Sequence, residues 1–244
     1  MAAGAKIIDL RNLLAERFPH PSCTTARRLI TGLPFLEEPI HGGLPRGVIT
    51  ELISPARSAT TPATSSRSDA GRAHSVAGGP GTSAGSASLI HALIHCAYRD
   101  NYFLALIDGR DSFDPCGLDN AWLQHLLWVR CSKASEAVKA ADLVLRDGNF
   151  PLVIVDLVLN APEELRKIPQ TNWYRLQRLV EVLPTACLVL TRYEMVSSAQ
   201  LKLVLENSWD IQTFESEDAL SRLRIVMKRS HLQSEVRSQQ SAVS

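Results

Sequence analysis

Four apolar runs recur from residue 102 onward, and stretches with helical periodicity separate them. The runs read "YFLALID", "LLWVRC", "PLVIVDL" and "ACLVLT". A continuous apolar run of this length is typical of a strand buried on both faces of a parallel sheet, and parallel strands need a crossover segment between them. The alternation therefore predicts an α/β domain with a mostly parallel sheet flanked by helices.

The segments around these runs complete the prediction. Apolar stripes with a 3.6-residue period start at Leu89, Ala134 and Trp173, and each predicts a helix. Residues 48–53 form a short apolar strand ahead of the first of these helices. The segments "SWDIQTF" and "RLRIVMK" alternate between apolar and polar residues, which predicts late edge or antiparallel strands.

The chain divides into three parts by composition. Residues 1–23 contain an apolar stripe over 5–18 that two prolines end, which predicts an N-terminal helix and linker. Residues 24–231 form the α/β core, interrupted at about 55–78 by a segment of Ser, Thr, Ala, Gly and Pro. That insertion and the polar tail 232–244 have few large apolar residues, so we expect both to be disordered.

Composition excludes several classes of protein. Hydrophobic residues make up 45% of the 244 residues, enough for a sizeable core, and the net charge of +1 does not indicate a dedicated nucleic-acid or membrane-surface protein. No apolar run is long enough to span a membrane, and the start lacks a signal-peptide pattern, so a cytoplasmic location is expected. A metal site is not expected, because His91 and His95, one helical turn apart, lack a third ligand nearby.

The segment "GGPGTSAGSAS" has the glycine spacing of a loop that binds phosphates and then opens a helix. A functional loop of the form G-x-x-x-x-G-K-[ST] carries lysine and a hydroxyl where this chain has Ser86 and Ala87, and its glycines are one residue closer together. We predict a vestigial nucleotide site with no cofactor, although bound ATP is the alternative. Its residues would be Gly79, Gly81, Gly85, Ser86 and Asp156, the last of which ends "PLVIVD".

The order of several motifs resembles the RecA family of recombination ATPases over most of the chain. The motifs are "GGLPRG", "LIDGRDSFDP", "FPLVIVDL" and "AQLKLVLENSWDIQ". The resemblance implies a RecA-type core. Two residues after Asp108, where the family carries the glutamate that orients the attacking water, this chain has Arg110, which cannot act as a base. We therefore assign no catalytic residue, and expect Asp108, Asp114 and Asp156 to be structural or vestigial.

Within this family the chain looks like the ImuA-like proteins of bacterial SOS mutagenesis. The resemblance implies a non-catalytic adaptor that supports error-prone translesion DNA synthesis, with RecA or an ImuB-like translesion polymerase as partner. The helix expected over 5–18 either docks on such a partner or packs on its own sheet. Two alternatives stay open: a weak DNA-dependent ATPase in recombination, and an SOS cell-division inhibitor like SulA.

Two groups of basic residues are candidates for contacts with DNA or a partner. They are Arg166, Lys167, Arg175 and Arg178 in one group, and Arg224, Lys228 and Arg229 in the other. The alternative for both groups is ordinary solvated charge. Weak DNA binding through them would fall steeply with salt. The gap "RYEMVSSAQ" is too short for the long mobile DNA-binding loop of the family.

Overall fold

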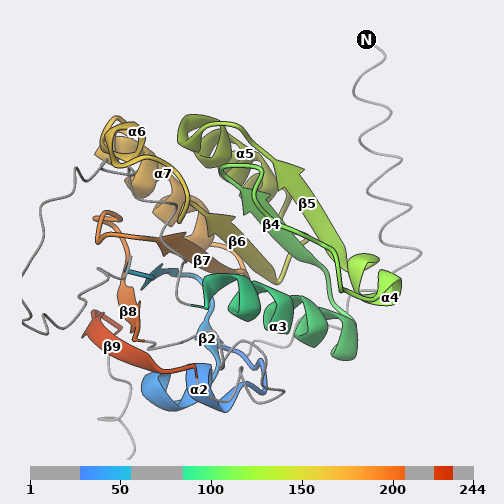
Figure 1. The fold of residues 1–244 in the computed structure, drawn as a ribbon. Helices are drawn as coiled ribbons and strands as arrows, with labels where there is room; N and C mark the ends of the chain where they lie inside the picture. Colours follow the sequence, from blue (N-terminus) through green and yellow to red (C-terminus); the bar gives the residue numbers. More distant parts are fainter. Residues whose placement is uncertain (1–27, 56–84, 207–222, 233–244) are drawn as a thin grey trace, which may run out of the picture.

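A seven-stranded sheet forms the centre of the molecule in the computed structural model, which describes residues 28–55, 85–206 and 223–232 (Figure 1). The strand order is β5-β4-β6-β7-β3-β8-β9. In chain order the strands are β3 (Ile49–Ile53), β4 (Leu104–Asp108), β5 (Leu126–Arg130), β6 (Leu152–Asp156), β7 (Ala186–Thr191), β8 (Leu201–Leu205) and β9 (Ile225–Ser230).

The sheet is mostly parallel, as the alternation of apolar runs predicted. Every neighbouring pair from β5 to β8 is parallel, and β9 alone runs antiparallel, beside β8. The strand predicted in "RLRIVMK" is confirmed, since β9 lies there. β8 was not predicted as a strand, since "AQLKLVL" was interpreted only as a segment leading to later strands. The other predicted late strand, "SWDIQTF", lies outside the described residues.

Helices cover both faces of the sheet (Figure 1). One face carries α3 (Ser86–Arg99), together with the short helices α2 (Pro34–Glu37) and η1 (Glu38–Ile40). The other carries α5 (Ala134–Asp147), α6 (Pro162–Arg166) and α7 (Gln170–Glu181). The two-stranded ribbon of β1 (Arg28–Leu29) and β2 (Leu44–Pro45) belongs to the α3 side, and α4 (Asn120–Leu123) precedes β5.

Successive residues of the central strands enter opposite cores. In β4, Leu104 and Leu106 pack on the α3 side, whereas Ala105 and Ile107 pack under α5 and α7. This alternation is why the central strands read as continuous apolar runs, because both faces of each strand are buried. The hydrophobic burial of these strands is the main force that holds the three layers together.

The run "LLWVRC" is an exception, because it was predicted as a buried strand and β5 is only half-buried. β5 stands at one edge of the sheet, and Leu127 is 39% exposed. Its outer end is occupied by Arg130, whose guanidinium lies 5.0 Å from the ring of Trp128 and also pairs with Asp111. Apolar composition alone did not distinguish this edge position from a central one.

Several predictions lie outside the described residues. They are the helix over 5–18, nearly all of the insertion at 55–78, and the tail except for its first residue. Within the part of the chain that the structure describes, no helix is both long enough and apolar enough to cross a membrane.

Candidate functional site

Two aspartates lie side by side at the carboxyl ends of the neighbouring strands β4 and β6. Asp108 and Asp156 are register partners. Gly109 follows Asp108 so closely against β6 that its amide donates to the Asp156 carbonyl at 2.9 Å, and an added Cβ would lie 2.5 Å from the side-chain oxygen of Asn160. The Asn160 amide in turn donates to the Gly109 carbonyl at 2.8 Å. Glycine is thus required where these strand ends meet.

Asp108 is held by the loop that follows it. Its carboxylate is 1% exposed and accepts hydrogen bonds from the backbone amides of Arg110 (3.1 Å), Ser112 (2.7 Å) and Phe113 (2.7 Å). Three amide donors satisfy most of the acceptor capacity of a carboxylate. The contacts of Asp108 are therefore those of a turn-building residue.

Asp156 has a different environment, although it ends its strand in the same register. Among the residues described, the hydrogen bond to its carboxylate comes from the backbone amide of Val158, at 3.0 Å. Burial is the main cause that raises the pKa of the Asp156 carboxyl; together with the opposing hydrogen bond from the Val158 amide and the like charge of Asp108, it brings this pKa to about 6. Asp156 is thus an acid with few hydrogen-bond donors, half protonated near pH 6 and mostly ionised at neutral pH.

A cleft of about 180 Å³ lies between the Asp156 end of β6 and the first turn of α3. Gly85 is the N-cap of α3 with φ of 86°, a left-handed conformation that suits glycine, and the buried Ser86 is the first residue of the helix. The structure thus brings Ser86 and Asp156 into the same cleft, next to Gly85. Gly79 and Gly81 lie outside the described residues.

The described lining of this cleft does not suit an anion. Its described lining residues are Ser86, Ala87, Ile90, His91, Ser112, Phe113, Asp114, Cys116, Asp156, Val158 and Leu159. None of these is a lysine or arginine, and two carry carboxylates. A triphosphate placed here would face Asp114 and Asp156 without a lysine or arginine from this lining to neutralise it. The amides at the start of α3 are the anion-attracting groups that remain.

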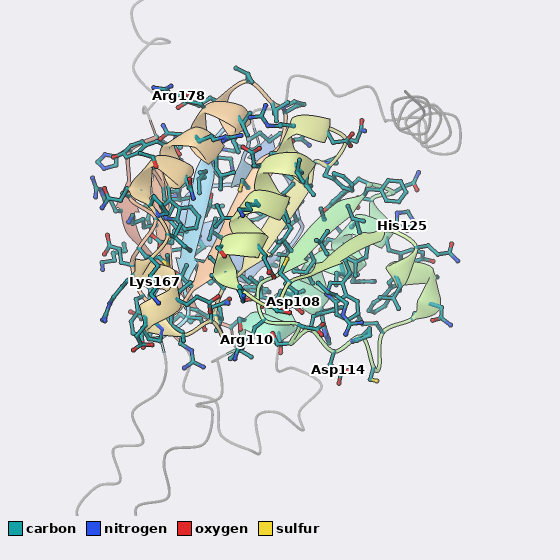
Figure 2. All side chains as sticks on the ribbon, turned by 90° about the horizontal axis from the view of Figure 1, so that it is seen from above. Asp108, Arg110, Asp114, His125, Lys167 and Arg178 are labelled. Atoms are coloured by element: carbon teal, nitrogen blue, oxygen red, sulfur yellow. The ribbon has the colours of Figure 1, made fainter. Side chains whose placement is uncertain are left out.

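Arg110 and the nearby lysines do not correct this charge balance. Arg110 is exposed on the loop after β4, where Figure 2 shows it near Asp108, and its guanidinium donates to the Ser132 carbonyl at 3.4 Å. Lys133 is the N-cap of α5, and Lys139 lies in the groove between α5 and α7. None of the three residues lines the cleft.

The two histidines of α3 make ring contacts. His91 packs edge-on against Phe113, and His95 packs against Trp122 with ring centroids 4.4 Å apart. Over the described residues, no group of three or more His, Cys, Asp or Glu side chains is arranged to hold a metal ion.

The first basic group does not converge on one surface. Lys167 follows α6 and Arg178 lies near the end of α7, and Figure 2 shows them at opposite ends of this helical layer. Arg166 borders a different hollow, between α6 and the segment after β7. Arg175 pairs with Asp142 of α5 at 2.7 Å. The group is therefore spread over the α6–α7 layer.

The second basic group lies on and before the edge strand β9. Arg224 precedes the strand, whereas Lys228 and Arg229 belong to it. The Lys228 ammonium pairs with Glu194 at 2.6 Å, so that part of its charge is already compensated within the molecule.

A buried ion-pair network around Glu51 was not predicted from the sequence. Glu51 of β3 is fully buried and pairs with Lys202 of β8 at 3.0 Å, and Lys202 also pairs with Glu194 at 3.0 Å. The signal available in the sequence is one charged residue inside each of two apolar strands, "ITELI" and "LKLVL". Only strand pairing shows that the two charges meet.

Comparisons with known proteins add no family to this description. Neither a scan against models of protein families nor a search of curated proteins found a match to this chain.

Proposed function

We propose that this chain is a non-catalytic RecA-like adaptor of the bacterial DNA-damage response. In this role it supports error-prone translesion synthesis by binding RecA or an ImuB-like polymerase, and it turns over no nucleotide. The observation that carries the non-catalytic part is the cleft at the start of α3, whose described lining has two carboxylates and no lysine or arginine. The adaptor role and its partners come from the motif resemblance described above.

The physical argument concerns charge. Phosphoryl transfer depends on cations that neutralise the charge of the transferred group and on a residue that positions the nucleophile. In this cleft Ser86 stands at the start of α3. Arg110 lies outside the cleft, and its guanidinium donates to the Ser132 carbonyl in the β5–α5 connection. Asp108, the other acid at this edge, is occupied by three backbone amides. The RecA-like frame would then serve as a scaffold for protein contacts.

Nucleotide binding is tested first, by titrating the purified full chain with a fluorescent ATP analogue with and without magnesium. We expect no saturable binding up to millimolar concentration. An Ala87→Asp variant, which adds a third carboxylate to the cleft, is the matched control and should give the same flat titration. Magnesium-dependent binding that Ala87→Asp abolishes would overturn the non-catalytic assignment.

The proposed protein partners are tested by pull-down of the tagged chain from bacteria treated with a DNA-damaging agent. Recovery of RecA or of a translesion polymerase is the expected result. If neither is recovered, the assignment to translesion synthesis fails, whatever the nucleotide titration shows.

A weak ATPase is the second candidate, and one observation favours it. Asp156 faces the first turn of α3 across the cleft with a carboxylate that only one described amide binds. This reading requires magnesium-dependent ATP turnover that is lost in Asp156→Ala. Absence of turnover in the unaltered chain excludes it.

A further inference from the structure

A surface groove of about 360 Å³ separates α5 from α7, on the side of the sheet opposite the α3 cleft. Its apolar floor is formed by Val138 and Leu176, which are 4% and 1% exposed. Leu143 stands at its side and is 69% exposed, although it is a large aliphatic residue in the middle of α5. A groove with an apolar floor and an exposed leucine offers area that a partner side chain would bury.

The polar rim of the groove is cationic. Lys139 and Arg175 line it from α5 and α7, and Arg146 stands one turn beyond Leu143. The carboxylate of Asp142 lies between the helices and is bound by both guanidinium groups, at 2.8 Å from Arg146 and 2.7 Å from Arg175. Its charge is thus compensated within the molecule, and the groove lining carries two cations, Lys139 and Arg175, against this one anion.

Asp142 also fixes the geometry of the rim. It is the common partner of one arginine on its own helix and one on the facing helix. Arg175 uses both Nε and Nη2 for this contact, the latter at 3.1 Å. Arg guanidinium groups hold carboxylates in such two-point geometry, and the remaining N–H groups can donate to a second carboxylate. The rim is therefore preorganised to receive an acidic group.

We propose that the α5–α7 groove binds an acidic peptide segment of a protein partner, with one large apolar side chain of that segment packed against Leu143 and the groove floor. Acidic residues on either side of this anchor would then pair with Lys139 and Arg175. The proposal deepens the adaptor function and rests on it for the existence of a protein partner. The chemistry of that partner follows from the groove itself.

The test selects short random peptides on a display library against the purified full chain and measures binding of the enriched peptides by fluorescence anisotropy. Enrichment should favour Asp and Glu around a single Leu, Phe or Trp. Leu143→Ser removes the apolar surface against which the peptide's anchor residue would pack, so it should weaken binding about tenfold. Lys139→Glu should weaken it severalfold, and binding should fall with added salt.

Two exposed positions outside the groove lining provide matched controls: Val182→Ser for the apolar change and Lys133→Glu for the charge change. Neither should alter peptide affinity. The proposal is overturned if no acidic peptides are enriched, or if enriched peptides bind the groove variants as well as the unaltered chain. It is also overturned if an oligonucleotide binds and Lys139→Glu reduces that binding while peptides do not compete, since the groove would then take DNA.

These outcomes are separable from those of the proposed function. If peptides bind but neither RecA nor a polymerase is recovered, the groove is a peptide-binding site and the assignment to translesion synthesis is wrong. Recovery of either partner by a Leu143→Ser variant as efficiently as by the unaltered chain would retain the pathway and place the contact elsewhere.

Discussion

Glu51 in β3 and Asp156 at the end of β6 are acids on central strands of one sheet, and the fold satisfies them very differently. Glu51 accepts hydrogen bonds from Thr191 Oγ1 and from the amides of Met195 and Val196, and pairs with the buried Lys202. Asp156 receives one described amide, from Val158, and faces a cleft. The buried charge of Glu51 thus fixes the segment after β7 and the neighbouring strand β8. The carboxylate of Asp156 has no such set of partners among the described residues.

This difference separates an acid that belongs to the packing from one that does not. A buried acid with several donors and a counter-charge is part of the packing, and its removal damages the fold. A half-buried acid with one described donor lowers stability while it is ionised. Substitutions at these acids and at their partners test this contrast.

Lys202→Met should lower the free energy of unfolding at neutral pH by about 3 to 5 kcal/mol, because it leaves the fully buried Glu51 without its counter-charge. Urea unfolding followed by circular dichroism measures the change. The double variant Glu51→Gln with Lys202→Met should recover most of the loss, since glutamine still accepts from the Met195 and Val196 amides. A double variant as unstable as Lys202→Met would show that the lysine acts through packing alone.

Asp108→Asn should lower the free energy of unfolding by about 2 to 3 kcal/mol, because an amide nitrogen would face backbone amides that now donate to a carboxylate. The same denaturant titration measures it. Asn160→Asp, a change at the neighbouring loop, tests whether the whole strand-end turn depends on these hydrogen bonds. An unchanged Asp108→Asn variant would remove the distinction between Asp108 and Asp156.

Asp156→Asn should raise the free energy of unfolding by about 1 to 3 kcal/mol at pH 8. The pKa of Asp156 is raised from 3.8 to about 6, so the folded chain holds this proton more tightly than the unfolded chain. The contribution of Asp156 to stability therefore falls as pH rises from about 4 through 6, and Asn removes that fall. Thermal unfolding across this pH range measures the gap, which should close near pH 4. An equal gap at every pH would contradict the assignment.

Glu194→Gln should change the free energy of unfolding by less than about 1 kcal/mol, because this side chain is 38% exposed. Its pKa is lowered to about 2 by hydrogen bonds from Lys228 and Lys202, so its contribution is present above about pH 4.5 and is lost as pH falls toward 2. Melting temperatures at low and high salt measure it, and salt should reduce the difference. A large loss of stability would show that the exposed Glu194 contributes as much as the buried members of the network.

Local pattern predicted the strands and helices well where burial is symmetrical. The runs that became β4, β6 and β7 were recognised as central strands because both of their faces are apolar. β5 has the same apolar character but an edge position, and β8 carries Lys202 inside an otherwise apolar segment. In both cases the neighbouring strand determined the role of the residues, and no local window contains that neighbour.

Local sequence alone determined the alternation of strands and helices, the presence of Ser86 and Ala87 where a G-x-x-x-x-G-K-[ST] loop carries lysine and a hydroxyl, and the presence of an acid at the end of two strands. These are properties of residue type and spacing along a few turns of chain. Tertiary structure alone decided that Asp108 is surrounded by amides while Asp156 faces a cleft, and that Glu51 meets Lys202. The reason is physical: the charge state and the stability contribution of a side chain depend on donors, counter-charges and solvent, and folding brings these together from distant parts of the chain.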